Sequence, residues 1–225
     1  MTAALQRGAA SASPSVDLAL LAPREGALHV LVDKGERGAM TLPWVRPRVG
    51  EALATAARGL AKRTAGVEPG WMEQLQAFGD PLKHPGAADV SIAYVGVLSG
   101  HAADGRIASR ASWLPVVQAG LGGRQAAILE AAITALRTRL DYAPIAFKLL
   151  PSTFTLSELQ GMYELLLGWA LHKASFRRSL QAAYLVEPTD EWRSEGRGRP
   201  AQLYRFAPRK RRQGRRGIRF DILGQ

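Results

Sequence analysis

The chain has 225 residues, of which 47% are hydrophobic, and this is enough apolar material for one large or two small domains. Its formal net charge is +11 and it contains no cysteine, which excludes disulfides, zinc–thiolate sites and cysteine nucleophiles. No apolar run reaches membrane-spanning length, so we expect no membrane partner, and a cytoplasmic location fits these observations.

The positive charge is concentrated toward the C-terminus. Residues 1–143 hold 15 Lys and Arg against 12 Asp and Glu, whereas residues 144–225 hold 15 against 7. A basic C-terminal third indicates a polyanionic partner. The basic tail, residues 208–225, contributes much of this charge, and alone it suits nucleic acid or an anionic membrane surface.

The N-terminal half alternates between β-type runs and helical patterns. The small, polar residues 1–14 are expected to form a disordered arm. The runs VDLALLAP and ALHVLVDKG predict two strands joined by a hairpin at 24–26. GAMTLPWVRPRVGE is predicted to be an irregular loop, and EALATAARGLAKRTAG a helix that ends at Gly66.

The elements after this helix complete a first domain. MEQLQAFGDPLKHPG is predicted to be a short polar segment and a turn, DVSIAYVGVLSG a strong strand, and GRIASRASWLPV a weak strand. GRQAAILEAAITALRTRLDY predicts a long helix, which Pro144 ends. Strands with one interrupting and one closing helix predict an α/β sandwich over residues 15–143.

A pair of short helices follows. Thr155 and Glu158 form a capping-box pattern, which predicts a helix beginning at Leu156, and Gly168 is expected to end it. A second helix is predicted from about His172 to Tyr184. Its apolar positions recur every four residues and are expected to face inward: Phe176, Leu180 and Tyr184.

The opposite face of this second helix is basic and rich in hydrogen-bonding groups. The major groove of DNA admits a helix with such a face. An amphipathic surface helix with solvated charges is the alternative. The residues expected to contact DNA are Lys173, Ser175, Arg177, Arg178 and Gln181.

Two β-runs, YLVEP and QLYRF, come next and enclose a polar loop with Arg193, Arg197 and Arg199. This order of elements predicts a winged helix-turn-helix domain over residues 144–207. Arg197 and Arg199 are expected to contact phosphates or the minor groove.

The loop and helix around LPWVRPRVGE resemble the box of a Nudix domain, whose glutamates hold a divalent metal against a diphosphate. Glu51 and Gly66 match this box. Leu60, Arg63 and Thr64 stand where the box has metal-binding glutamates, and shifting the frame by one residue does not restore the acids. Without clustered carboxylates we expect no metal site, no cofactor and no catalytic residue.

The second half makes the resemblance specific. LLP at 149–151, FTL at 154–156, YE at 163–164, SFRR at 175–178 and GRP at 198–200 are similar to motifs of the Nudix-related transcriptional regulators, the NrtR-like family. Ser175 stands where asparagine is usual in that family. The resemblance implies an α/β (α+β) Nudix-like sandwich followed by a winged helix-turn-helix domain. It also implies a homodimeric repressor of NAD metabolism or sugar pathways that responds to an effector such as ADP-ribose.

Basic residues in place of the box acids suit an anionic effector bound without metal, because guanidinium groups pair bidentately with phosphate oxygens. Trp44 is placed to stack an adenine or to serve as a structural aromatic. A solvated basic face on a domain that only dimerises is the alternative. The candidate effector-binding residues are Arg46, Arg48, Glu51, Lys62 and Arg63.

Two other functions remain in view, a Nudix-type hydrolase and an RNA-binding protein, each with a C-terminal third that captures nucleic acid. The lost acids count against the hydrolase. The SFRR and GRP motifs count against generic RNA binding, which favours exposed stacking aromatics. We expect three partners: a double-stranded DNA operator, a second copy of the chain and a small-molecule effector.

Overall fold

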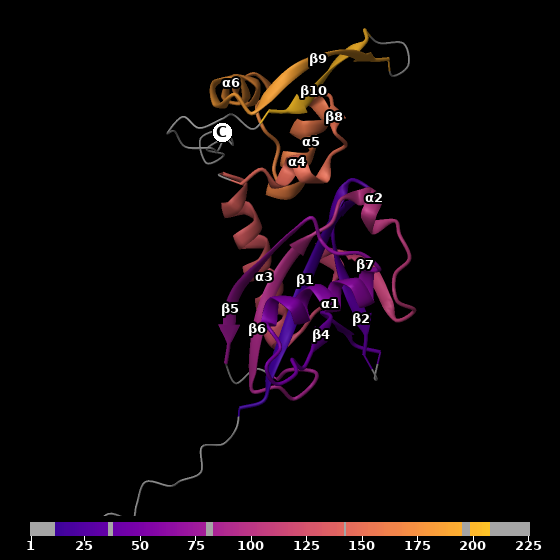
Figure 1. Ribbon diagram of the computed structural model, residues 1–225, viewed down its shortest axis with the longest axis vertical. Helices are drawn as coiled ribbons and strands as arrows, with labels where there is room; N and C mark the ends of the chain where they lie inside the picture. Colours follow the sequence, from indigo (N-terminus) through magenta and orange to yellow (C-terminus); the bar gives the residue numbers. More distant parts are fainter. Residues whose placement is uncertain (1–11, 36–37, 80–82, 142, 195–198, 208–225) are drawn as a thin grey trace, which may run out of the picture.

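The computed structural model describes residues 12–35, 38–79, 83–141, 143–194 and 199–207. A large sheet flanked by helices forms the N-terminal part, and a smaller helical unit with its own sheet forms the C-terminal part (Figure 1). The predicted arm lies outside the described residues up to residue 11, and Pro14 already belongs to the first strand. The basic tail, residues 208–225, also lies outside the described residues.

The large sheet is mixed, with the strand order β3-β2-β1-β6-β5, β4 beside β1, and β7 beside β2. β1 and β6 run parallel, and the other paired strands run antiparallel. The elements of this part are β1 (Pro14–Arg24), β2 (Ala27–Lys34), β3 (Met40–Thr41), β4 (Trp44–Val45), α1 (Leu53–Ala65), β5 (Trp71–Phe78), β6 (Val90–Val97), α2 (Gly100–Ala103), β7 (Ala111–Pro115), η1 (Val116–Gln118) and α3 (Gly123–Leu140).

The central strand β1 is buried on both faces, which explains its continuous apolar sequence. Leu18 and Leu20 pack in the same cluster as the buried residues of α1. Ala19 and Leu21 pack with the buried residues of α3. The sheet is therefore sandwiched between α1 and α3, and the predicted α/β sandwich is confirmed.

Local signals predicted most of these elements and missed one strand. The hairpin between β1 and β2 is confirmed, and its turn residues Glu25 and Gly26 have φ of 48° and 74°, as a two-residue hairpin turn requires. The prediction of a polar segment without a strand after α1 is wrong, because Trp71–Phe78 forms β5. β5 lies at the sheet edge, where its glutamate and glutamines can face water. The predicted irregular loop also contains the short strands β3 and β4.

The C-terminal part has the predicted order of two helices and two strands, with two additional elements. A three-stranded sheet in the order β8-β10-β9 packs beside the helices. The elements are α4 (Ile145–Leu149), β8 (Thr153–Phe154), α5 (Leu156–Leu167), α6 (Lys173–Ala183), β9 (Val186–Arg193) and β10 (Ala201–Phe206). β8 and α4 were not predicted.

One continuous apolar core joins the two parts. α5 contacts α3, β1 and β2, so the C-terminal part sits on one end of the sandwich. The buried Leu136 of α3 belongs to the same cluster as Phe147 and Tyr163. No helix within the described ranges is long and apolar enough to cross a membrane.

Candidate functional site

Short-range hydrogen bonds fix both ends of α5. The Thr155 hydroxyl accepts from the Glu158 amide at 3.1 Å, and the Glu158 carboxylate accepts from the Thr155 amide at 2.7 Å, so the predicted capping box is confirmed. Gly168 ends α5 in the left-handed conformation with φ of 85°. The Glu164 carboxylate then accepts from the Leu171 amide at 2.8 Å, which holds the turn that leads into α6.

α6 presents a basic face outward. Phe176 and Leu180 are fully buried, as predicted, and Phe176 packs edge-on against the Tyr163 ring with centroids 5.4 Å apart. The inward orientation predicted for Tyr184 is wrong: it is the left-handed cap after the helix, and 56% of it is exposed. The helix leaves four of its predicted DNA-contacting side chains exposed: Lys173, Arg177, Arg178 and Gln181.

Ser175 differs from the other residues of this face. It is half-buried, and its hydroxyl lies 3.1 Å from Nδ1 of His172, the residue that caps the start of α6. A hydroxyl shared with the cap has less freedom to meet a base edge. Ser175 therefore lies beside the exposed basic face and helps to fix the first turn of the helix.

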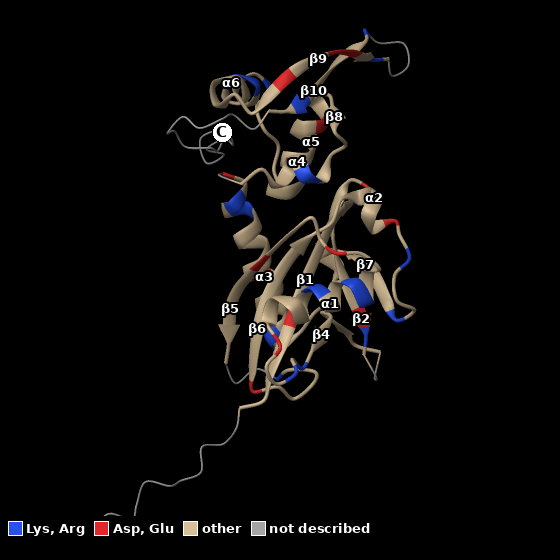
Figure 2. Cartoon of the chain, in the orientation of Figure 1, with Lys and Arg blue, Asp and Glu red and all other residues tan. Residues whose placement is uncertain are grey.

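The arginines predicted in the wing loop occupy different positions in the structure. Arg193, predicted in the loop, ends β9 and pairs with the Glu158 carboxylate at 2.7 Å, so it supports the start of α5. Arg199 is exposed and lies two residues before β10 begins. Arg197 lies outside the described residues. β9 carries acidic residues of its own (Figure 2), and its Glu187 pairs with Arg205 of β10.

Four of the five candidate effector residues line one small pocket. Arg46, Arg48, Glu51 and Arg63 surround a cavity of about 360 Å³ between the loop after β4 and α1. Glu51 also accepts from the Arg48 amide at 2.9 Å, which closes the loop on itself. Lys62 is exposed on α1 and does not line this pocket.

The positions of the lost box acids are filled in a way that suits no metal. Leu60 is packed in the core and is 4% exposed. The Thr64 hydroxyl donates to the Leu60 carbonyl at 2.9 Å, and Arg63 projects a positive charge into the small pocket. Among the described residues, no group of three His, Asp or Glu side chains could hold a metal ion.

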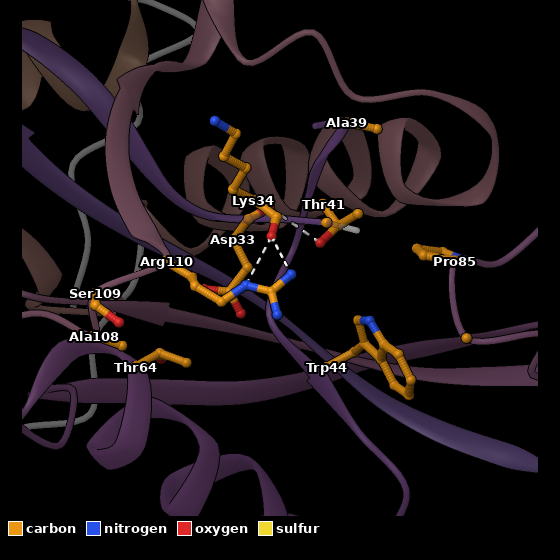
Figure 3. A pocket seen from close by; sticks show the side chains of 12 residues that line it. Asp33, Lys34, Ala39, Thr41, Trp44, Thr64, Pro85, Ala108, Ser109 and Arg110 are labelled. Carbon is orange, nitrogen blue, oxygen red and sulfur yellow. Dashed lines mark hydrogen bonds between the residues drawn. The ribbon is translucent and has the colours of Figure 1, made fainter. Parts of the chain in front are cut away.

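A second, larger pocket of about 890 Å³ lies next to the first, and sequence reasoning missed it. Trp44 and Pro85 stand on one side, and Thr64 and Ser109 stand on the other (Figure 3). The Arg110 guanidinium lies between these sides and donates to the Lys34 carbonyl at 2.7 Å and 3.1 Å. Burial raises the pKa of the neighbouring Asp33 carboxyl, although the charge of Arg110 opposes this shift.

A hydrogen bond joins a residue that lines the small pocket to a residue that lines the larger one. The Arg46 guanidinium donates to the Gly86 carbonyl at 2.8 Å. Trp44 lies edge-on to His84 with ring centroids 5.0 Å apart, and a Cβ on Gly86 would lie 2.2 Å from the indole. The loop at 84–86 is therefore in contact with residues that line both pockets.

Behind this loop lies a buried polar cluster that sequence reasoning also missed. The Gly86 amide donates to Nδ1 of His84 at 3.0 Å, so Nε2 carries the ring proton and donates to Asp17 at 2.9 Å. The Asp17 carboxylate also accepts from Ser15 at 2.6 Å and from Gln125 at 3.2 Å. Burial raises the pKa of the Asp17 carboxyl, but these hydrogen bonds, together with the electrostatic interaction with His84, hold that pKa below its ordinary value.

Comparisons with known proteins agree with this architecture. A family model described as the NrtR DNA-binding winged helix domain matches residues 146–206. The ADPR responsive transcriptional repressor NtrR of Acinetobacter baylyi is 30% identical over 205 residues, which cover 86% of this chain and 81% of that protein.

Solved structures extend the similarity to both parts of the chain. Shewanella oneidensis NrtR, crystallised with a 27mer DNA, is 29% identical with a TM-score of 0.74, covering 86% of this chain and 93% of that chain. A MutT/nudix family protein from Enterococcus faecalis is 17% identical with a TM-score of 0.65, covering 87% and 86%. At that identity the second match shows the fold alone.

Proposed function

Because the chain belongs to the NrtR family of Nudix-related transcriptional regulators, we propose that it is a DNA-binding repressor that responds to an effector such as ADP-ribose. One observation carries this proposal: α6 is anchored by buried Phe176 and Leu180 and exposes a basic face at its N-terminal half. A helix so held and so charged suits the major groove. The relatives support this function, since one is named as a repressor and another was crystallised with DNA.

The proposed division of labour follows the two parts of the fold. Residues 15–143 form the effector-binding and dimerisation domain, and residues 144–207 form the DNA-binding domain. Arg178 and Lys173 read base edges, Gln181 and Arg177 support this contact, and Arg197 and Arg199 hold phosphates or the minor groove. The regulator acts in the cytoplasm on genes of NAD metabolism.

The effector is proposed to occupy both pockets at once. Arg46, Arg48 and Arg63 bind its phosphates in the small pocket, where guanidinium groups replace the metal of a Nudix hydrolase. The larger pocket takes the remainder of the molecule beside Trp44, and Asp33 offers a carboxylate to sugar hydroxyls. Lys62 is a peripheral positive charge on the same helix.

A gel shift on the native upstream region, with a panel of nucleotides and sugars, tests the proposed function. We expect a shifted band whose intensity changes with ADP-ribose. Arg63→Glu should weaken the ADP-ribose response by roughly tenfold or more, because it removes a charge-assisted hydrogen bond and adds repulsion. The control is Arg58→Glu, on the exposed side of α1 and away from both pockets. Equal losses in both variants would contradict the assignment of the small pocket.

We expect no metal-dependent hydrolysis of ADP-ribose or related nucleoside diphosphates. Leu60, Arg63 and Thr64 leave no carboxylate cage, and Arg63 repels a divalent cation. The measurement is the release of phosphate-containing products in the presence of Mg²⁺ or Mn²⁺, compared with a metal-free blank. An active Nudix hydrolase is the positive control. Turnover above the blank would show that the domain is an enzyme.

We expect a homodimer assembled mainly through residues 15–143, because two-fold symmetric operators are read by dimers with half-sites about one helical turn apart. Light scattering on the full chain should give about twice the 24.3 kDa of one copy. A chain ending at residue 143 should give a dimer too. A monomeric full chain would contradict the dimer, and a dimer that is lost on truncation would place the interface in residues 144–225.

A further inference from the structure

We propose that α3 couples the two pockets to the helix-turn-helix, and that Arg137 is the positioning residue through which the C-terminal end of α3 holds the turn before α6. This inference rests on the proposed function, since it assigns the route by which an effector reaches the DNA-binding part. It is carried by contacts at both ends of one helix, which runs along the sandwich toward the C-terminal part (Figure 1).

The N-terminal end of α3 is linked by hydrogen bonds to the segment 84–88, which includes the loop at 84–86. The Gln125 side chain donates to Asp17 at 3.2 Å, and Asp17 accepts from His84, whose ring accepts from the Gly86 amide. Arg124 donates to the Ala88 carbonyl at 2.8 Å. The same Gln125 accepts from the amide of Leu42, just before the strand that holds Trp44, at 2.7 Å. The hydrogen bonds of Gln125, Arg124 and Asp17 are buried, so a shift of the loop is resisted or shared by α3.

The body of α3 transmits such a shift as a unit. It is an 18-residue helix, about 27 Å long at the usual rise per residue. Ile128, Ala132 and Leu136 are fully buried against the sheet and against α5. A close-packed helix of this kind moves as a rigid element rather than bending.

The C-terminal end of α3 meets the turn between α5 and α6. The Arg137 guanidinium carbon lies 5.7 Å from the ring centroid of Trp169, a cation–π contact. Gly168 leaves room for it, because a Cβ there would lie 2.7 Å from an Arg137 nitrogen. Trp169 is 41% exposed, so the guanidinium covers an aromatic that α5 and α6 leave open. Four residues later α6 begins at Lys173, so the angle of this turn sets the angle of the basic helix.

Hydrogen exchange measured by mass spectrometry on the full chain tests the contact without needing DNA or effector. Arg137→Ala should speed exchange of the amides at 168–172 by about two- to fivefold, the factor that matches an exposed cation–π contact. Trp169→Ala should give the same increase, the double variant no more than either single one, and Arg137→Lys a partial rescue. The control is Arg58→Ala on α1, which should leave this segment unchanged.

The coupling is tested by adding ADP-ribose to the same proteins. Wild type should change exchange at 83–88 and at 168–172, whereas Arg137→Ala should keep the first change and lose the second. Unchanged exchange at 168–172 in Arg137→Ala without ligand would overturn the positioning role. A wild-type response at 83–88 alone would overturn the coupling and leave the effector proposal standing. No response at either segment would overturn the proposed effector together with the coupling.

Discussion

Arg178→Ala is expected to weaken operator binding by about 1–3 kcal/mol and to flatten discrimination at one base position. Arg178 is exposed in the second turn of α6, two residues beyond the buried Phe176 that fixes the helix. A guanidinium there reaches a base edge in the major groove, and its bidentate bond to guanine is lost on truncation. Titrations of wild type and variant on operator and scrambled DNA, at several salt concentrations, measure both effects.

Arg199→Ala provides the matched comparison for Arg178→Ala. Arg199 is exposed at the end of the wing loop, where a phosphate contact is expected. Its loss should weaken binding to operator and scrambled DNA alike. It should also reduce the slope of the logarithm of the binding constant against the logarithm of salt concentration by about one. If folded Arg178→Ala binds operator as tightly as wild type, α6 is not the reading helix, and the basic residues of 208–225 become the leading candidates.

The helix ends were predictable because each depends on a local rule. Gly66 and Gly168 both adopt the left-handed conformation that ends α1 and α5, and Thr155 with Glu158 begins α5. Such signals need only a few neighbouring residues. The prediction that Tyr184 faces inward was wrong because it extended the helical periodicity past the end of α6. Periodicity says nothing about residues beyond the one at which a helix ends.

The strand β5 shows where sequence patterns are weak. Glu73, Gln74 and Gln76 make its sequence read as a polar segment, yet it pairs along β6. An edge strand has only one hydrogen-bonded neighbour and keeps much of its surface in water, so composition does not mark it. Arg139 of α3 pairs with Glu73, a contact between distant segments that local reasoning cannot supply.

Some parts of the candidate site could be predicted from the sequence and others could not. Four of the five candidate effector residues line the small pocket and Lys62 does not; the four could be grouped from the sequence because they lie in one loop and one helix of a familiar motif. The larger pocket joins four separate segments of the chain, so no stretch of sequence signals it. The buried cluster around Asp17 left one trace, a charged residue inside an otherwise apolar strand.

Asp17→Ala is expected to lower the free energy of unfolding by about 3–5 kcal/mol, the usual result of breaking a buried charged network. The carboxylate is fully buried and accepts from His84, Ser15 and Gln125, all of which would lose a partner in a site closed to water. Chemical denaturation followed by circular dichroism measures the change. Asp89→Ala is the control, because Asp89 is exposed and its carboxylate accepts from the Ser13 amide at the surface, so its loss should cost about 0.5 kcal/mol or less.

The same variant should change how stability depends on pH. The pKa of Asp17 is lower in the folded protein than in the unfolded chain, so its ionised form stabilises the fold at every pH above the unfolded value of about 3.9. That stabilisation is lost as pH falls through the folded pKa, which gives wild type a steep decline in acid. Asp17→Ala lacks this group, so its unfolding free energy should fall less between about pH 5 and pH 3. A decline as steep as that of wild type would show that other carboxyls, and not the buried cluster, govern acid unfolding.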